Sequence, residues 1–170
     1  MEIILAENHG FCYGVKRAVE MADEAANSEG KSYTLGPIIH NPQVVGRLES
    51  KGVSPIQEVA DIDEGTMIIR SHGVGPAIYA EAEEKGLHIL DATCPHVKKA
   101  QQDAKSVIED GMTLVILGEK NHPEVKSINL WANNKGIIIE DENSAEKLQI
   151  VEKMGVVVQT TFSQFKFNSI

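Results

Sequence analysis

Short apolar runs alternate with stretches of helical periodicity along almost the whole chain, and this alternation is what most limits its possible folds. The predicted strands are residues 3–5, 33–35, 67–69, 87–90, 113–117, 137–139 and 156–158. Between them apolar residues recur at helical spacing, as at Val97, Ala100 and Ala104, whereas residues 53–66 are expected to be a loop and 143–149 a helix. Continuous apolar strands separated by helices indicate an α/β fold with mostly parallel sheets.

Polar side chains follow most of the predicted strands. Ligands bind beyond the carboxyl ends of the strands in folds of this class. We therefore expect the residues at these positions to converge on one site. They are Cys12, His40, Ser71, His72, Cys94, His122, Glu124 and Thr160.

A short internal repeat divides the chain into two similar units. Leu35, Gly36 and His40 recur as Leu117, Gly118 and His122, an offset of 82 positions. We expect an N-terminal strand and loop over 1–12, a first α/β lobe over 13–95 and a second over 96–170. A binding site between such copies, where their strand ends face each other, is a reasonable expectation.

Composition narrows the function classes. The 170 residues carry a net charge of -9, which argues against broad binding to nucleic acids or acidic membranes. No apolar run approaches the roughly 20 residues of a membrane helix, and no secretory signal is visible. Two cysteines are too few for a disulfide framework, so we expect reduced thiols and a cytoplasmic location.

Both cysteines stand where a strand turns into a helix. Cys94 precedes Pro95, which suits a first helical position, and Cys12 opens the helical pattern after the first strand. Unpaired N–H groups at a helix entrance favour thiolate over thiol. Several interpretations stay open: zinc held with histidines, a thiolate nucleophile, an iron–sulfur cluster, or two buried apolar side chains.

Three histidines occupy turns that open helices. An imidazole beside free backbone N–H groups suits an anion such as phosphate or diphosphate, which we expect His40, His72 and His122 to bind. Each could also be an ordinary turn residue. Glu124 could be a helix-dipole carboxylate or a proton donor. The hydroxyls that follow the last strand, on Thr160 and Thr161, could be strand residues or part of a proton relay.

Six motifs in order resemble one known family. They are Glu7–Val15 around Cys12, Gly36–Pro42 around His40, Arg70–Val74 around His72, Asp91–Pro95 around Cys94, Asn121–Val125 around His122, and Gln159–Thr161. Together they resemble the IspH/LytB family of 4-hydroxy-3-methylbut-2-enyl diphosphate reductases of the non-mevalonate isoprenoid pathway. The resemblance covers essentially the whole chain.

The resemblance implies a [4Fe-4S] enzyme that removes the hydroxyl of an allylic diphosphate, giving isopentenyl and dimethylallyl diphosphates. It implies Cys12 and Cys94 as cluster ligands, and a diphosphate clamp of His40, His72 and His122, to which we add Thr161. It also implies Glu124 as proton source with Thr160 beside it. The expected partners are the substrate and an electron donor such as ferredoxin or flavodoxin, with no nucleic acid and no membrane.

The family also has a third lobe, with a third cluster cysteine, after the Gln-Thr-Thr motif. This sequence stops at Ile170, so we expect it to correspond to the N-terminal two-thirds, with Glu2–Leu5 poorly supported. Two other function classes remain: a zinc- or thiol-dependent hydrolase, and a non-catalytic diphosphate-binding module.

Overall fold

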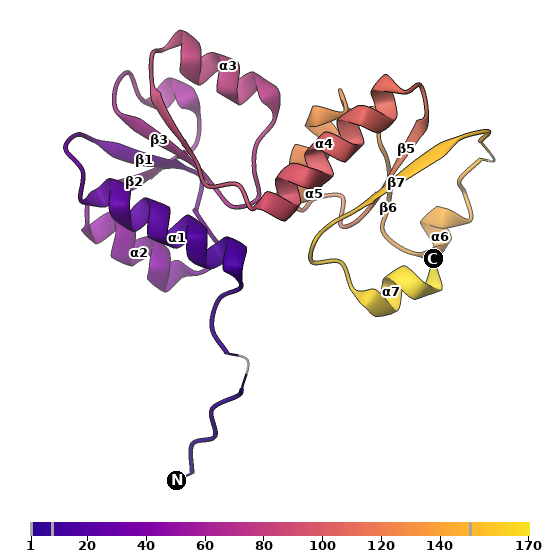
Figure 1. The fold of residues 1–170 in the computed structure, drawn as a ribbon, viewed down its shortest axis with the longest axis horizontal. Helices are drawn as coiled ribbons and strands as arrows, with labels where there is room; N and C mark the ends of the chain where they lie inside the picture. The colour runs from indigo at the N-terminus through magenta and orange to yellow at the C-terminus, as the bar shows by residue number, and fades with distance from the viewer. Residues whose placement is uncertain (1, 8, 150) are drawn as a thin grey trace.

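The structure, a computed structural model, describes residues 2–7, 9–149 and 151–170, and it contains two separate parallel sheets (Figure 1). The first sheet has the strand order β2-β1-β3-β4 and the second has the order β6-β5-β7. The expected α/β fold with two lobes and parallel strands is therefore confirmed.

The first lobe buries both faces of its sheet. Its strands are β1 (Ser32–Leu35), β2 (Val53–Ile56), β3 (Thr66–Ile69) and β4 (His88–Asp91). One face packs on α1 (Tyr13–Ala26) and α2 (Pro42–Ser50), and the other packs on α3 (Pro76–Glu84). Within β3, Ile68 joins the first core and Ile69 the second, because successive strand side chains point to opposite faces.

The second lobe repeats this plan. Its strands are β5 (Thr113–Leu117), β6 (Ile137–Ile139) and β7 (Met154–Val158). The long helix α4 (Pro95–Glu109), which lies between the two sheets in Figure 1, packs with α5 (Pro123–Trp131) on one face. The short helix α6 (Glu142–Ala145) contributes Ala145 to the core of the other face, and α7 (Gln164–Ser169) follows near the C-terminus.

Strand register confirms the internal repeat. β1 lies between β2 and β3, as β5 lies between β6 and β7. Leu35 is the last residue of β1 and pairs with Ile56 and Ile69. Leu117 holds the same place in β5, beside Ile139 and Val158. The two copies therefore present the polar residues after these strands at equivalent positions; the boundary between lobes at residue 95 stays a prediction.

Three local predictions were wrong. Residues 3–5 form no strand: Ile3, Ile4 and Leu5 are 71–84% exposed, and the segment points away from the first lobe (Figure 1). Without buried partners an isolated apolar run has nothing to stabilise it as a strand. Residues 53–66 are not simply a loop, since they contain β2 and a short 3₁₀ helix, Val59–Asp61. The helix expected near 143–149 is only the short α6.

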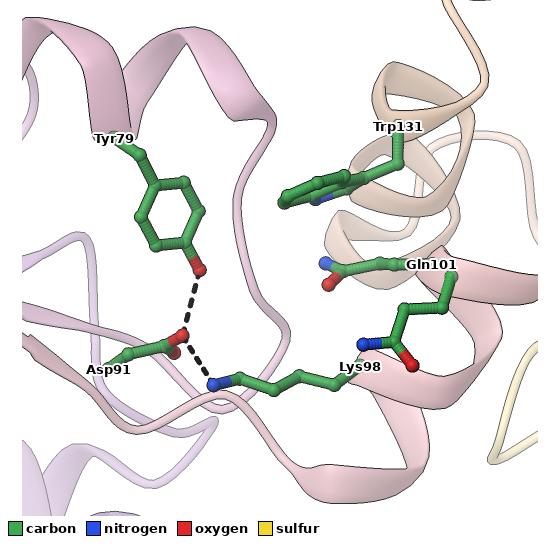
Figure 2. A pocket seen from close by; sticks show the side chains of 6 residues that line it. Tyr79, Asp91, Lys98, Gln101 and Trp131 are labelled. Carbon is green, nitrogen blue, oxygen red and sulfur yellow. Dashed lines mark hydrogen bonds and ion pairs between the residues drawn. The ribbon is translucent and has the colours of Figure 1, made fainter. Parts of the chain in front are cut away.

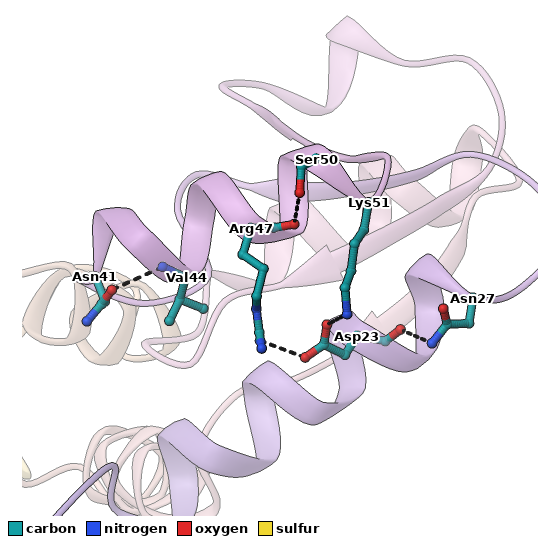
Figure 3. A network of polar contacts seen from close by, with 7 residues as sticks. All are labelled: Asp23, Asn27, Asn41, Val44, Arg47, Ser50 and Lys51. Carbon is teal, nitrogen blue, oxygen red and sulfur yellow. Dashed lines mark hydrogen bonds and ion pairs between the residues drawn. The ribbon is translucent and has the colours of Figure 1, made fainter.

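An ion-pair network fastens α1 to α2 on the surface of the first lobe (Figure 3). Asp23 accepts from Arg47 at 2.7 Å and from Lys51 at 2.6 Å. Exposed pairs of this kind contribute only about 0–1 kcal/mol each, so the apolar core between the helices does most of the stabilising.

In the part of the chain that the structure describes, no helix is both long and apolar enough to cross a membrane.

Candidate anion-binding site

Three imidazoles from both lobes meet at the carboxyl ends of the sheets. One nitrogen of each of His40, His72 and His122 lies within 4.8 Å of the others. The ring centroids of His40 and His72 are 4.5 Å apart, and those of His72 and His122 are 5.4 Å apart. Each histidine follows a strand: β1, β3 and β5 respectively. The predicted convergence of these three histidines is therefore confirmed.

Burial disfavours the charged form of His72. His40 is exposed, and the other two are half-buried. Burial, followed by the nearby His40, His122 and Arg70, lowers the pKa of His72 to about 4. Adding a proton would place a second positive charge beside Arg70 in a poorly solvated place. An arriving anion reverses this balance, because it stabilises protonated or N–H-donating imidazoles.

A helix cap fixes the tautomer of His122. This residue is the N-cap of α5, and its Nδ1 accepts a hydrogen bond from the Glu124 N–H at 3.2 Å. A neutral imidazole that accepts at Nδ1 carries its proton on Nε2. The free edge of the ring is thus an N–H donor, which suits an anionic oxygen. A metal ion would need the lone pair that this tautomer lacks.

Glu124 is buried, at 2% exposure. Both of its carboxyl oxygens accept hydrogen bonds from Thr160, in the turn that follows β7. Its Oε1 accepts from the Thr160 N–H at 2.6 Å and its Oε2 accepts from the Thr160 hydroxyl at 2.9 Å. Thr160 itself is exposed. The hydroxyl therefore connects a carboxylate inside the protein to the open side of the site.

Gln159 orients the turn that follows β7. It is buried, accepts from the Glu119 N–H through Oε1 at 2.9 Å, and donates through Nε2 to the Thr161 hydroxyl at 2.8 Å. Thr161 is exposed and uses its oxygen as acceptor, so its proton is free for another partner.

One stripe of α5 ties the two lobes together. Glu124, Ser127 and Trp131 lie at i, i+3 and i+7, hence on one side of the helix. Ser127 Oγ donates to the His72 carbonyl at 2.8 Å, and Trp131 Nε1 donates to the Val74 carbonyl at 2.9 Å. The helix that carries His122 at its cap thereby also holds the backbone of the His72 turn.

The two cysteines are the N-caps of α1 and α4, and neither side chain makes a capping hydrogen bond. Cys12 is exposed and Cys94 half-buried. The helix starts are adjacent, since a methyl group on Gly14 would lie 2.5 Å from Cys94 Sγ. The Cys94 N–H donates to the Ser71 carbonyl at 2.9 Å, which places this thiol one residue from the His72 turn.

A separate cleft of about 220 Å³ opens at the seam between the lobes (Figure 2). Its polar groups satisfy one another: Asp91 accepts from the Tyr79 hydroxyl at 2.9 Å and from Lys98 at 2.6 Å. Although burial pushes the other way, these hydrogen bonds hold the pKa of Asp91 below its usual range, whereas burial raises that of Tyr79. With its charges paired, this cleft is a weaker ligand site than the histidine cluster.

Sequence reasoning identified the histidines of the cluster and the residues beside them, but it missed the side chains whose hydrogen bonds keep these residues in place. Ser127 and Trp131 carry no sequence signal beyond helical spacing, and Arg70 and Gln159 were quoted only as parts of motifs. The periodicity of α5 could have pointed to Ser127 and Trp131, because they continue the stripe that starts at Glu124. Their hydrogen-bond partners are backbone carbonyls of the other lobe, which no sequence pattern can predict.

Fold and site together define a two-lobed parallel α/β protein with a cluster of three histidines between its strand ends. The profile of the LytB protein family matches residues 3–170. The chain belongs to the LytB family, in agreement with the resemblance of its six motifs.

Curated relatives support this assignment. The chain is 50% identical over 163 residues to 4-hydroxy-3-methylbut-2-enyl diphosphate reductase of Geobacter metallireducens, covering 96% of this chain and 58% of the relative. It is 45% identical over 170 residues to that of Trichlorobacter lovleyi, covering 100% of this chain and 61% of the relative. The chain thus spans about three-fifths of the length of these relatives.

Solved structures agree. An (E)-4-hydroxy-3-methyl-but-2-enyl diphosphate reductase, described as the terminal enzyme of the non-mevalonate pathway, matches with a TM-score of 0.85 at 45% identity. That match covers 98% of this chain and 60% of the chain in the solved structure. The E-1-hydroxy-2-methyl-but-2-enyl-4-diphosphate reductase of Plasmodium falciparum matches with a TM-score of 0.90 at 32% identity, over 95% and 52% of the two chains.

Proposed function

We propose that this chain supplies the diphosphate clamp, the proton source and two cluster ligands of a 4-hydroxy-3-methylbut-2-enyl diphosphate reductase. The observation that carries the proposal is the gathering of His40, His72 and His122 within 4.8 Å at the ends of strands from both lobes. Membership of the family, whose relatives bear that reductase name, supports the substrate class. The reductant would be an external donor of the ferredoxin or flavodoxin type.

The imidazoles would bind and orient the diphosphate. His122 offers Nε2–H because its Nδ1 is occupied by the helix cap. Hydrogen bonds to a charged oxygen are worth about 1.5–3 kcal/mol each, so three imidazoles account for tight binding without any metal ion. The Thr161 proton, left free by its bond from Gln159, would add a fourth donor. Holding the anion in this way positions the allylic hydroxyl for reaction.

Proton delivery would run from Glu124 through Thr160 to the substrate. The overall change breaks one C–O bond, takes up two electrons and two protons, and releases the hydroxyl as water. Glu124 is buried and Thr160 exposed, so the threonine hydroxyl is the exit of this route. Rotation of that hydroxyl would pass a proton from the carboxyl group outward while the turn stays fixed by the Thr160 N–H bond.

Cys12 and Cys94 would hold an iron–sulfur cluster, for which their placement is suitable. Both thiols stand at helix N-termini, and neither side chain is used by a cap. Three cysteines can suffice for a four-iron cluster, so these two leave at least one position to be supplied from elsewhere. Such a cluster, when bound, provides the electrons and a Lewis acid for the leaving hydroxyl.

Anion binding tests the clamp directly. We expect inorganic pyrophosphate to bind the 170-residue chain in isothermal titration calorimetry, and His40→Ala or His122→Ala to weaken it about tenfold or more. His88→Ala is the matched control, because His88 is an exposed histidine on β4. Unchanged affinity in both clamp variants would refute this function for the cluster.

Iron binding separates the reductase from a simple anion-binding module. After anaerobic reconstitution with ferrous iron and sulfide, we expect the chain to retain iron and acid-labile sulfide together, and to lose both in Cys12→Ser or Cys94→Ser. Stoichiometric zinc that survives air, with no sulfide, would instead identify a zinc-dependent hydrolase. Pyrophosphate binding without any metal dependence would support the non-catalytic module.

A further inference from the structure

The chain has three arginines, and one of them differs from the others in its surroundings. Arg17 donates to the Thr93 and Asp91 carbonyls, and Arg47 pairs with Asp23 (Figure 3). The Arg70 side chain has no hydrogen bond or ion pair to any residue that the structure describes, and its Nε is buried. A half-buried guanidinium without a counter-ion is costly, and burial accordingly lowers the pKa of Arg70.

The internal repeat shows what the neighbouring lobe does at the same place. Arg70 follows the last residue of β3 as Gln159 follows that of β7. Both side chains lie over the glycine after the central strand: a methyl group on Gly36 would be 2.7 Å from Arg70 Nη1, and one on Gly118 would be 2.9 Å from Gln159 Oε1. Gln159 is satisfied by its own lobe, whereas the donors of Arg70 are left for a ligand.

Arg70 lines a cleft between the lobes with a volume of about 320 Å³. Lys126 of α5 lines it too, and among residues 2–7, 9–149 and 151–170 this lysine has no ion pair. The rest of the lining includes the apolar Val74, Ile78 and Leu130. None of the three clamp histidines, Glu124 or Thr160 lines this cleft.

We propose that this cleft is a second anion site, which binds a small phosphate ester with a short apolar group. A guanidinium presents two parallel N–H donors that match phosphate geometry, and a lysine adds a point charge. The apolar walls provide room for a few carbon atoms beside the charged end. The volume lies at the lower end of the roughly 300–1,000 Å³ typical of small-molecule pockets, so a compact ligand fits best.

Calorimetry with isopentenyl diphosphate tests the proposal. We expect two binding events per chain, and Arg70→Gln should weaken one of them about tenfold or more while the other, lost in His40→Ala, persists. Inorganic pyrophosphate, which lacks the apolar group, should bind the Arg70 site more weakly. Arg47→Gln makes the same charge change at a paired surface position and should leave both events intact.

Thermal unfolding gives a second measurement. Without ligand, Arg70→Gln should be at least as stable as the wild type, because it removes an uncompensated charge, and it should lose part of the stabilisation that ligand confers. If Arg70→Gln failed to fold, the exposed Lys126→Gln would replace it. A single binding event abolished by His40→Ala, or equal behaviour of Arg70→Gln and Arg47→Gln, would overturn the second site and leave the clamp proposal standing.

Discussion

Ser127 provides the sharpest test of how the lobes are joined. Its Oγ donates to the His72 carbonyl at 2.8 Å across the seam, can donate instead to the Glu124 carbonyl at 2.9 Å, and accepts from Gln101 Nε2 at 3.2 Å. Both Ser127 and Gln101 are buried, at 2% and 3% exposure. Ser127→Ala therefore removes an acceptor and a donor from a place where both side chains are almost fully buried.

The cost follows from these contacts. Losing one net hydrogen bond costs about 1 kcal/mol, and leaving the buried Gln101 amide without its acceptor adds about 1–3 kcal/mol, for a total of roughly 2–4 kcal/mol. The matched control is Ser106→Ala on α4, since Ser106 is exposed and its side chain makes no hydrogen bond within the described residues. That control should change the free energy of unfolding by less than about 0.5 kcal/mol.

Fluorescence can follow this seam directly. Trp131 is the single tryptophan, and its indole donates to the Val74 carbonyl two residues beyond His72. In urea unfolding followed by Trp131 emission, Ser127→Ala should lower the midpoint, and pyrophosphate affinity should fall with it because the His72 turn loses an anchor. A free energy of unfolding equal to that of Ser106→Ala would show that the contact contributes nothing, and would refute the reasoning.

Three further predictions concern packing, protonation and the buried carboxylate. Gly14→Ala should destabilise by about 1–3 kcal/mol in urea because its methyl would press on the Cys94 thiol, whereas Gly46→Ala, with open space in α2, should stabilise by about 0.5–1 kcal/mol; equal effects would contradict the close approach. His72 should titrate by NMR near pH 4, against 6.5 when unfolded. As the pH falls, the unfolded chain takes up this proton first, so the free energy of unfolding that is present above pH 6.5 should decrease as the pH drops towards 4. Pyrophosphate should raise the pH at which His72 titrates. A titration midpoint at pH 6.5 in the folded protein would contradict the effect of burial. Glu124→Ala should cost about 1–3 kcal/mol in the same urea assay, because the Thr160 N–H would lose its acceptor, while Glu83→Ala on the exposed side of α3 should be nearly neutral; a neutral Glu124→Ala would contradict the observed bonding.

Much of this architecture could be predicted from the sequence, because the signals were periodic. Continuous apolar strands at β3 and β5 predicted a parallel sheet, and the repeat of Leu35 and His40 at Leu117 and His122 predicted equivalent lobes. Two strand ends that carry the same histidine must present it at the same edge of their sheets. Topology thus placed each histidine at the carboxyl edge of its own sheet, whereas their meeting also depends on the contacts of α5 with the first lobe.

The remaining features depended on contacts that leave no local signature. β2 was missed because Ser54 and Pro55 interrupt its apolar character, yet pairing along β1 makes it a strand. The run Ile3–Leu5 was wrongly predicted as a strand. Its residues favour strands locally, but they have no neighbouring strand or core to bury them. In both segments tertiary pairing decided the structure.

A single helix, α5, positions several parts of the site through residues spaced along its length. They are His122, Glu124, Ser127 and Trp131. The cap fixes which nitrogen of His122 carries the proton, the first turn places Glu124 against Thr160, and the next two turns hold the His72 and Val74 carbonyls. A small rotation of α5 would therefore change the histidine cluster, the proposed proton route and the contacts between the lobes together. Since the donors of both lobes are set by this one element, anion binding should stiffen the seam, and Trp131 emission should respond to pyrophosphate although Trp131 lines a different cleft.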